Sequence, residues 1–200
     1  GIAAEWIFFG WGDPRNWAPD LVTGWTLIAC GLVAWSRRPD SRSGPLMAAT
    51  GFSWFLGNFA ASGVDPVDWL GAHALYLYRG PLVHLLVTYP RGRLSSYLDR
   101  VTVGIGYAAA VVTPVWRSEI ATIVLAFLLV VVCARLYAQA VGPSRRARLL
   151  ALWAAAGLGL VLAGGAAARL ALSAGNVSEP SLLALEATLC ALAGVLLAGL

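Results

Sequence analysis

Residues 120–148 read IATIVLAFLLVVVCARLYAQAVGPSRRAR, and this stretch decides the class of fold. Residues 120–141 are mostly apolar, and about 20 such residues in a helix cross a hydrocarbon core of roughly 30 Å. A Gly-Pro turn and an arginine cluster follow the apolar run at once. The stretch therefore predicts a membrane-spanning helix that ends beside a basic loop.

The same pattern repeats along the chain and predicts an all-α, polytopic bundle of seven transmembrane helices. The predicted helices are residues 19–35, 44–62, 69–89, 101–116, 120–141, 149–173 and 180–200. Residues 1–18 are predicted to form an outer segment, in which residues 1–11 resemble the end of one more helix. Residues 19–200 form the bundle. With no initiator Met at Gly1 and a helix still running at Leu200, we expect the chain to be part of a longer protein.

The arginines indicate an orientation. Three clusters lie in alternate connections of the chain: Arg37/Arg38/Arg42, Arg91/Arg93/Arg100 and Arg145/Arg146/Arg148. The other connections carry mostly acids: Asp13, Asp20, Asp65, Asp68, Glu119 and Glu179. Because basic residues in short loops stay on the cytoplasmic side, the N-terminus is predicted outside and the last helix runs inward. The expected location is the bacterial cytoplasmic membrane, as a multi-pass protein.

Composition supports this class and excludes others. Apolar residues make up 59% of the chain and charged residues 12%, with a mean hydropathy of +0.74, far from the range of soluble domains. The expected partner is the lipid bilayer. The net charge of +4 does not indicate nucleic acid, because the arginines flank membrane segments where anionic headgroups account for them.

A polar stripe inside the third predicted helix is the sharpest functional signal. An ionisable residue at mid-membrane costs about 2.5–3.5 kcal/mol on insertion scales, so it needs a partner or a purpose. Arg79 is such a residue, with Pro81 close by to kink the helix. The candidate pocket residues on the stripe and on neighbouring helices are His73, Tyr76, Arg79, His84, Trp54, Asn58 and Glu186.

Two ion pairs could neutralise Glu186. We expect it to pair with Arg169 near the end of the sixth predicted helix, or with Arg79. Three interpretations remain open for these groups: an ion pair that fixes helix packing, a ligand or signal pocket around Arg79, and a path for protons or ions.

Several specific chemistries do not fit the sequence. The chain has no lysine for a retinal Schiff base, and its two histidines, His73 and His84, lie on one helix instead of facing each other across a haem. No converging set of metal ligands and no phosphate loop or nucleophile elbow is visible. The sequence therefore predicts no catalytic residue, metal or cofactor in these residues.

Residues 17–100 carry motifs that resemble the membrane input region of sensor histidine kinases from high-GC Gram-positive bacteria. The motifs are Trp17-x-Pro19-Asp20, Gly24-Trp25, Trp35-x-Arg37-Arg38-Pro39, Gly44-x-Leu46-Met47, Gly51-Phe52-x-Trp54-Phe55-x-Gly57-Asn58, Arg79-Gly80-Pro81-Leu82-x-His84-Leu85 and Tyr89-Pro90-x-Gly92-Arg93. The resemblance thins over the last four predicted helices, where only composition and loop placement agree.

The resemblance implies a sensory domain of a two-component system. It would pass an envelope or membrane signal to a cytoplasmic kinase that uses ATP and Mg²⁺, and from there to a response regulator. Small residues four apart predict close packing of helices, within the chain or across a homodimer: Gly104/Ala108, Gly159/Ala163 and Gly194/Ala198.

Three other functions remain as alternatives: a small transporter or permease, a membrane enzyme acting on lipid or isoprenoid substrates, and a membrane anchor of another cytoplasmic output domain. A transporter would usually show broken helices at matching positions of two repeats. A lipid enzyme would need clustered acids, whereas Glu186 is the one acid predicted inside the membrane.

Overall fold

The computed structural model describes residues 1–172 and 179–200, and every element within them is helical. The elements are α1 (Ile2–Phe9), α2 (Pro14–Arg37), α3 (Ser43–Leu56), the 3₁₀ helix η1 (Gly57–Ala61), α4 (Asp65–Ala74), α5 (Arg79–Thr88), α6 (Tyr97–Val111), α7 (Thr113–Trp116), α8 (Glu119–Gln139), α9 (Pro143–Leu172) and α10 (Glu179–Ala198). The all-α class is confirmed. The predicted helix end at residue 173 lies outside the described residues.

Four of the described helices are long and apolar enough to cross a membrane. They are Pro14–Arg37, Glu119–Gln139, Pro143–Ala171 and Pro180–Ala198. The other three predicted spans are each divided in two: residues 44–62 into α3 and η1, residues 69–89 into α4 and α5, and residues 101–116 into α6 and α7. The structure thus shows four candidate membrane spans, and for these three segments the prediction of transmembrane helices stays a prediction.

The break between α4 and α5 follows from a local change of hydrogen bonding. At residues 75–78 the backbone N–H groups of Arg79 and Gly80 donate to the carbonyls three residues earlier, of Tyr76 and Leu77, at 3.0 and 3.1 Å. Pro81 then falls in the first turn of α5, where its missing N–H is not needed. The irregularity expected at Pro81 thus lies one turn before it. The carbonyl of Leu77, which would face the missing N–H of Pro81 in a regular α-helix, instead accepts the hydrogen bond from Gly80.

The N-terminal boundary also differs from the prediction. The carboxylate of Asp13 accepts a hydrogen bond from the Arg15 N–H at 3.0 Å and caps α2, which begins at Pro14. This places Asp20 inside α2 and not in a loop. Residues 2–9 form the separate helix α1, in which Glu5 is fully buried.

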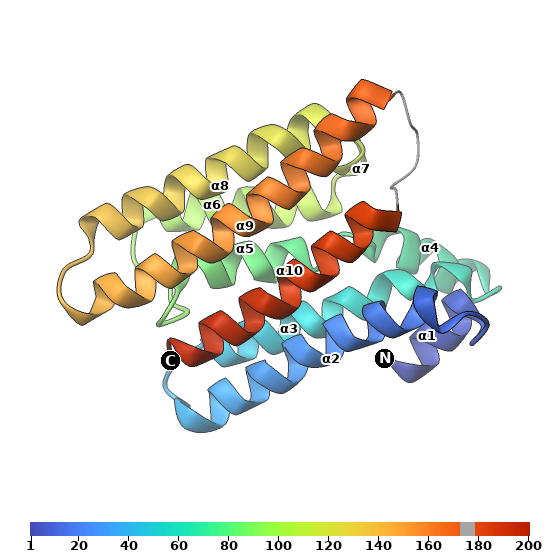
Figure 1. Cartoon of the computed structure of the whole chain (residues 1–200), viewed down its shortest axis with the longest axis horizontal. Coiled ribbons are helices and arrows are strands. Elements are labelled where there is room, and N and C mark those ends of the chain that lie inside the picture. Colours follow the sequence, from blue (N-terminus) through green and yellow to red (C-terminus); the bar gives the residue numbers. More distant parts are fainter. Residues whose placement is uncertain (173–178) are drawn as a thin grey trace.

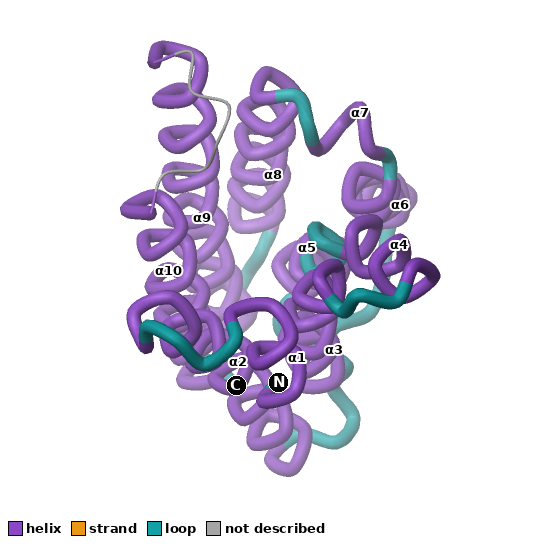
Figure 2. Tube along the Cα trace, turned by 90° about the vertical axis from the view of Figure 1, so that its right-hand side faces the viewer, coloured by secondary structure: helices purple, strands orange, loops and turns teal. Residues whose placement is uncertain are grey.

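The helices run side by side along one long axis (Figure 1). Helices α2 and α3 form one antiparallel pair and α8 and α9 another, and α10 packs against both α2 and α9. In the second view, α5 lies inside the bundle while α6 and α4 lie toward one edge (Figure 2). The C-terminus lies at the same end as the α2–α3 and α8–α9 loops.

Residues of the basic loops converge at this end of the bundle, which we call the basic end. It is defined by residues that line one basin: Arg37, Arg38, Arg91, Arg93, Ser144 and Gly199. The carbonyl oxygen of Pro90 accepts hydrogen bonds from the hydroxyls of Ser41 and Ser43 at 2.7 and 2.8 Å. The sequence-based expectation that alternate loops share one side therefore agrees with the spatial arrangement.

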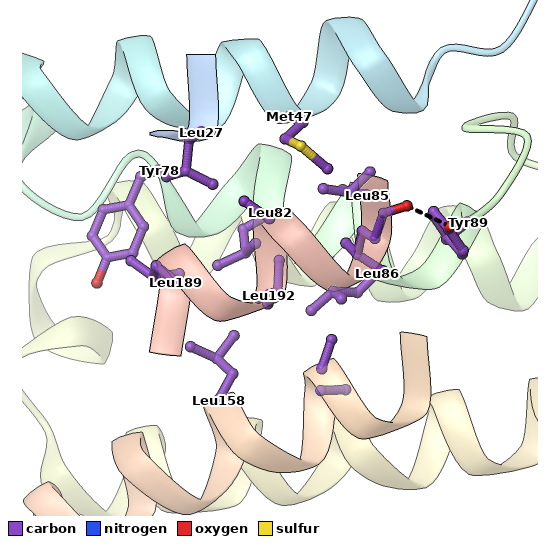
Figure 3. Close-up of a cluster of buried hydrophobic side chains, with 14 of the residues drawn as sticks. Leu27, Met47, Tyr78, Leu82, Leu85, Leu86, Tyr89, Leu158, Leu189 and Leu192 are labelled. Carbon is purple, nitrogen blue, oxygen red and sulfur yellow. Dashed lines mark hydrogen bonds between the residues drawn. The ribbon is translucent and has the colours of Figure 1, made fainter. Parts of the chain in front are cut away.

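The core lies between α5 and its neighbours. In the close-up, Leu85 of α5 lies beside Met47 of α3, whereas Leu82 and Leu86 lie toward α10, with Leu158 of α9 beyond (Figure 3). These side chains are at most 2% exposed. The buried hydroxyl of Tyr89 donates to the carbonyl oxygen of Leu196 at 2.7 Å, which ties the end of α5 to the end of α10.

The closest helix contact is between α2 and α3 and depends on glycine. A Cβ at Gly31 would lie 2.5 Å from the backbone nitrogen of Ala48 and 2.8 Å from the carbonyl oxygen of Gly44. The two backbones therefore touch where no side chain fits, as in other membrane helix pairs with small residues at the interface.

Of the three small-residue pairs predicted to pack against another helix, one does so in the structure. A Cβ at Gly159 would lie 3.0 Å from Val130, so this position does face a helix contact. Gly104 and Gly194 have nothing within 4 Å outside their own helix. Spacing alone did not identify the α2–α3 seam.

We predict that Gly31→Leu separates α2 from α3 and lowers the free energy of unfolding by at least about 1–3 kcal/mol, the usual cost of overpacking. Gly104→Leu is the matched control, because a side chain there meets open space. Thermal unfolding in a mild detergent measures both variants. Equal melting temperatures for the two would contradict the seam.

Candidate functional site

A cavity of about 340 Å³ lies within the bundle, on the side away from the basic end, and we call it the polar cavity for the polar side chains in its otherwise apolar wall. Residues from α1, α2, α3, η1, the 75–78 turn, α5, α9 and α10 line it. Its polar and aromatic residues are Phe8, Phe9, Asp20, Trp54, Asn58, Tyr76, Tyr78, Arg79, Arg169 and Ser181. Of the predicted pocket residues, the structure thus brings together Trp54, Asn58, Tyr76 and Arg79.

The two histidines lie elsewhere. His73 is exposed on α4, where its ring packs on Trp69 with centroids 4.3 Å apart. His84 lines a different cavity, with Arg42, Arg93 and Arg100 near the basic end. The predicted stripe assumed one continuous helix. It placed His73, Tyr76 and His84 on one face, with Arg79 at its edge. The hydrogen bonding changes at residues 75–78, and neither histidine lines the cavity of Tyr76 and Arg79.

Glu186 is buried in α10 but does not line the cavity. It is 3% exposed, and its Oε2 accepts no hydrogen bond from the described residues. One turn later, the sulfur of Cys190 lies 3.7 Å from the hydroxyl of Thr23 on α2. Because α2 and α10 run in the same direction, Glu186 lies near the level of Asp20, one turn before Thr23.

The predicted Glu186–Arg169 ion pair does not form in the structure. Arg169 instead binds Glu119 in a two-point contact, with Nε to Oε1 at 2.6 Å and Nη2 to Oε2 at 2.7 Å. Glu119 begins α8 and Arg169 lies near the end of α9, so the antiparallel pairing of these helices sets the two side chains at one level. Sequence reasoning had assigned Glu119 to an outer loop.

Two acids that sequence reasoning did not place in the pocket meet at Asn58. The amide nitrogen of Asn58 donates to Glu5 Oε1 at 3.0 Å and to Asp20 Oδ2 at 2.8 Å. Glu5 is 0% exposed, and all three side chains are buried. Glu5 is an isolated acid in an apolar run, and that is the signal that could have identified it.

Glu5 is the member of this cluster that keeps a proton. Helix α1 is not among the four candidate membrane spans. Burial, and then the neighbouring Asp20, raise the pKa of Glu5 from the ordinary value of 4.5 to about 9. The carboxyl groups of Glu5 and Asp20 can therefore lie together in a buried position, because Asn58 donates to both of them and Glu5 keeps its proton.

The charge of Arg79 has no carboxylate beside it among the described residues. Its guanidinium lies 4.3 Å from the centroid of the Tyr76 ring, a cation–π distance, and its buried Nε has no acceptor. Within residues 1–172 and 179–200 it forms no ion pair. The Nε1 of Trp54, on another wall of the cavity, also has no acceptor, while its ring packs edge-on against Tyr78.

This arrangement favours binding of an anion over catalysis. Two buried N–H donors without acceptors, one of them on a cation, suit an oxygen that carries negative charge. In the part of the chain that the structure describes, no group of three His, Cys, Asp or Glu side chains could hold a metal ion. Among the described residues that line the cavity, Arg79 Nε and Trp54 Nε1 are thus buried donors that still need an acceptor.

Comparisons with models of protein families, with curated proteins and with solved structures give no match for this chain. No activity of another protein therefore bears on the cavity. Its chemistry rests on the residues that line it.

We predict that Asn58→Ala lowers the free energy of unfolding by about 1–3 kcal/mol, because two buried carboxyl groups lose their shared donor. Asn16→Ala, at an exposed position of α2, is the control. Melting temperatures in detergent compare them. A loss no larger than that of Asn16→Ala would show that the cluster does not stabilise the fold.

We also predict that stability falls as the pH rises from about 4.5 to about 9. In this window the folded protein keeps the Glu5 proton and the unfolded chain has released it, so the slope is negative, at most about 1.4 kcal/mol per pH unit. Melting temperatures across the window test this. Glu5→Gln should flatten the slope, and an unchanged slope would place the proton elsewhere.

Proposed function

We propose that this chain is the membrane-embedded sensory region of a two-component sensor histidine kinase, with Arg79 and its cavity as the signal-binding site. The observation that carries the proposal is a cation in the bundle that has no carboxylate partner among the described residues, beside a helix that leads to the basic end. The motifs over residues 17–100 support the kinase assignment.

The proposed membrane topology has seven crossings. Helices α2, α8, α9 and α10 cross as single helices, while α3 with η1, α4 with α5 and α6 with α7 cross as divided ones. Broken helices are tolerated at membrane depth where protein covers them or where they line a cavity. The basic end lies in the cytoplasm under the positive-inside rule, and α10 runs toward it.

The signal would reach the cytoplasm through α10. Leu182 and Leu185 of this helix line the cavity, and Leu196 at its other end accepts the hydrogen bond of Tyr89. A ligand shifts a two-state equilibrium only when it binds one state better than the other. An anion at Arg79 changes the contacts at the cavity end of α10, so α10 would transmit the change by rotation or translation.

The proposed partners follow from this role. The chain would act as a homodimer and control a cytoplasmic kinase domain that binds ATP and Mg²⁺. That domain would phosphorylate a response regulator. No group of the described cavity takes part in phosphoryl transfer in this proposal.

We predict that the intact gene product, in membrane vesicles with ATP and Mg²⁺, incorporates phosphate on histidine, which is lost in acid and stable in base. Omission of Mg²⁺ is the control. The coding sequence after Leu200 should contain a helix pair with an exposed histidine and an ATP-binding domain. An early stop codon, or no phosphohistidine, would reject the kinase assignment.

A further inference from the structure

A second cavity, almost entirely apolar, lies beside the first one. It has a volume of about 270 Å³ and runs between α6 and α8, with α5 and α9 behind it. Aliphatic side chains form most of its wall, among them Leu82, Val101, Ile105, Leu125, Leu129 and Leu158. We call this cavity the α6–α8 groove.

The groove exists because α6 packs against α5 and not against α8. Val112 between α6 and α7 has an extended backbone, and the short α7 carries the chain across to α8 (Figure 2). At the floor of the groove, a Cβ at Gly106 would meet Val83 of α5 at 2.9 Å. Glycine thus holds α6 close to α5 and leaves the side toward α8 open.

The groove and the polar cavity meet at Arg79. Tyr78, Arg79 and Leu162 line both of them. The two cavities therefore adjoin at these residues: one has two N–H donors that lack acceptors, and the other is bounded by aliphatic side chains. A molecule that satisfies both cavities has a charged head and a hydrocarbon chain.

The hydrogen-bond donors of the cavity favour an anionic head. Glu119 neutralises Arg169, and Asp20 already accepts a hydrogen bond from the amide of Asn58 beside a protonated Glu5. Arg79 forms no ion pair within the described residues, and its Nε has no acceptor among them. A bound anion would receive charge-assisted hydrogen bonds from it, which are stronger than those between neutral groups.

We propose that the two cavities form one site for an amphiphile taken from the bilayer, with an anionic headgroup at Arg79 and Trp54 and a single hydrocarbon chain in the α6–α8 groove. This inference deepens the proposed function, on which it rests, by naming the class of ligand. Occupation would wedge α6 from α8 and contact α9, against which α10 packs.

The full chain in phosphatidylcholine nanodiscs tests the site with a photoactivatable fatty acid that carries a diazirine at mid-chain. After illumination, mass spectrometry maps the adducts. We expect them on groove residues of α6 and α8, with competition by oleate and much weaker competition by oleyl alcohol. Adducts spread over lipid-facing residues of the other helices would overturn the proposal.

Variants separate the two parts of the site. Arg79→Gln should reduce the adducts about tenfold, from the loss of a charged hydrogen bond, while Arg79→Lys retains part of the binding. Arg135→Gln, at an exposed position outside both cavities, is the matched control. Equal yields for Arg79→Gln and Arg135→Gln, or equal competition by oleyl alcohol, would reject headgroup recognition.

The groove has its own pair of variants. Ala109 lines the groove, and Ala108 is exposed on another face of the same helix. Ala109→Phe should abolish the adducts and Ala108→Phe should not, with melting temperatures confirming that both fold. Equal labelling of the two would reject the groove. Because the readout needs no ATP, binding without phosphohistidine would reject only the kinase assignment, and phosphohistidine without binding would reject only the ligand.

Discussion

The structure depends on one constraint: in an apolar surrounding, buried polar groups must find partners inside the protein. Buried threonines meet it locally, since the hydroxyls of Thr23, Thr50 and Thr88 donate to carbonyls four residues earlier in their own helices. Asn58 meets it across the fold by joining α1 and α2 to η1. Arg79 Nε, Trp54 Nε1 and Glu186 Oε2 do not meet it among the described residues, and Arg79 is the cation of this group.

Sequence patterns predicted the features that depend on composition and chain order. Long apolar runs gave the all-α class, and the arginine clusters gave the loops that converge at the basic end. Hydropathy could not predict the change at residues 75–78, where backbone hydrogen bonds join residues three apart instead of four apart. Such a change of backbone hydrogen bonding leaves the hydropathy of the sequence the same. The α2–α3 seam was missed because glycine spacing does not say which helix lies opposite.

The candidate site was predicted in part for the same reasons. Polar side chains are unusual in apolar helices, because placing them inside a membrane costs free energy. This cost alone identified Trp54, Asn58, Tyr76 and Arg79 as residues that need an explanation. The prediction that Arg169 pairs with Glu186 was wrong, because the antiparallel pairing of α8 and α9 brings Glu119 to Arg169 instead. Asp20 was not predicted to line the site, because it lies at the start of the predicted helix 19–35 and was counted with the acids of the outer connection.

Helix packing differs across the bundle, and this difference bears on the proposed response of α10 to a ligand. Helices α2 and α3 touch through their backbones, and Pro90 is bonded to the loop between them, so this half resists separation. Helices α6 and α8 are held apart and enclose the groove. Under the proposal, a molecule entering between them would push the tightly packed pair of α8 and α9 away from α6. Because α10 packs on both α2 and α9, a movement of α9 relative to α2 would change the position of α10.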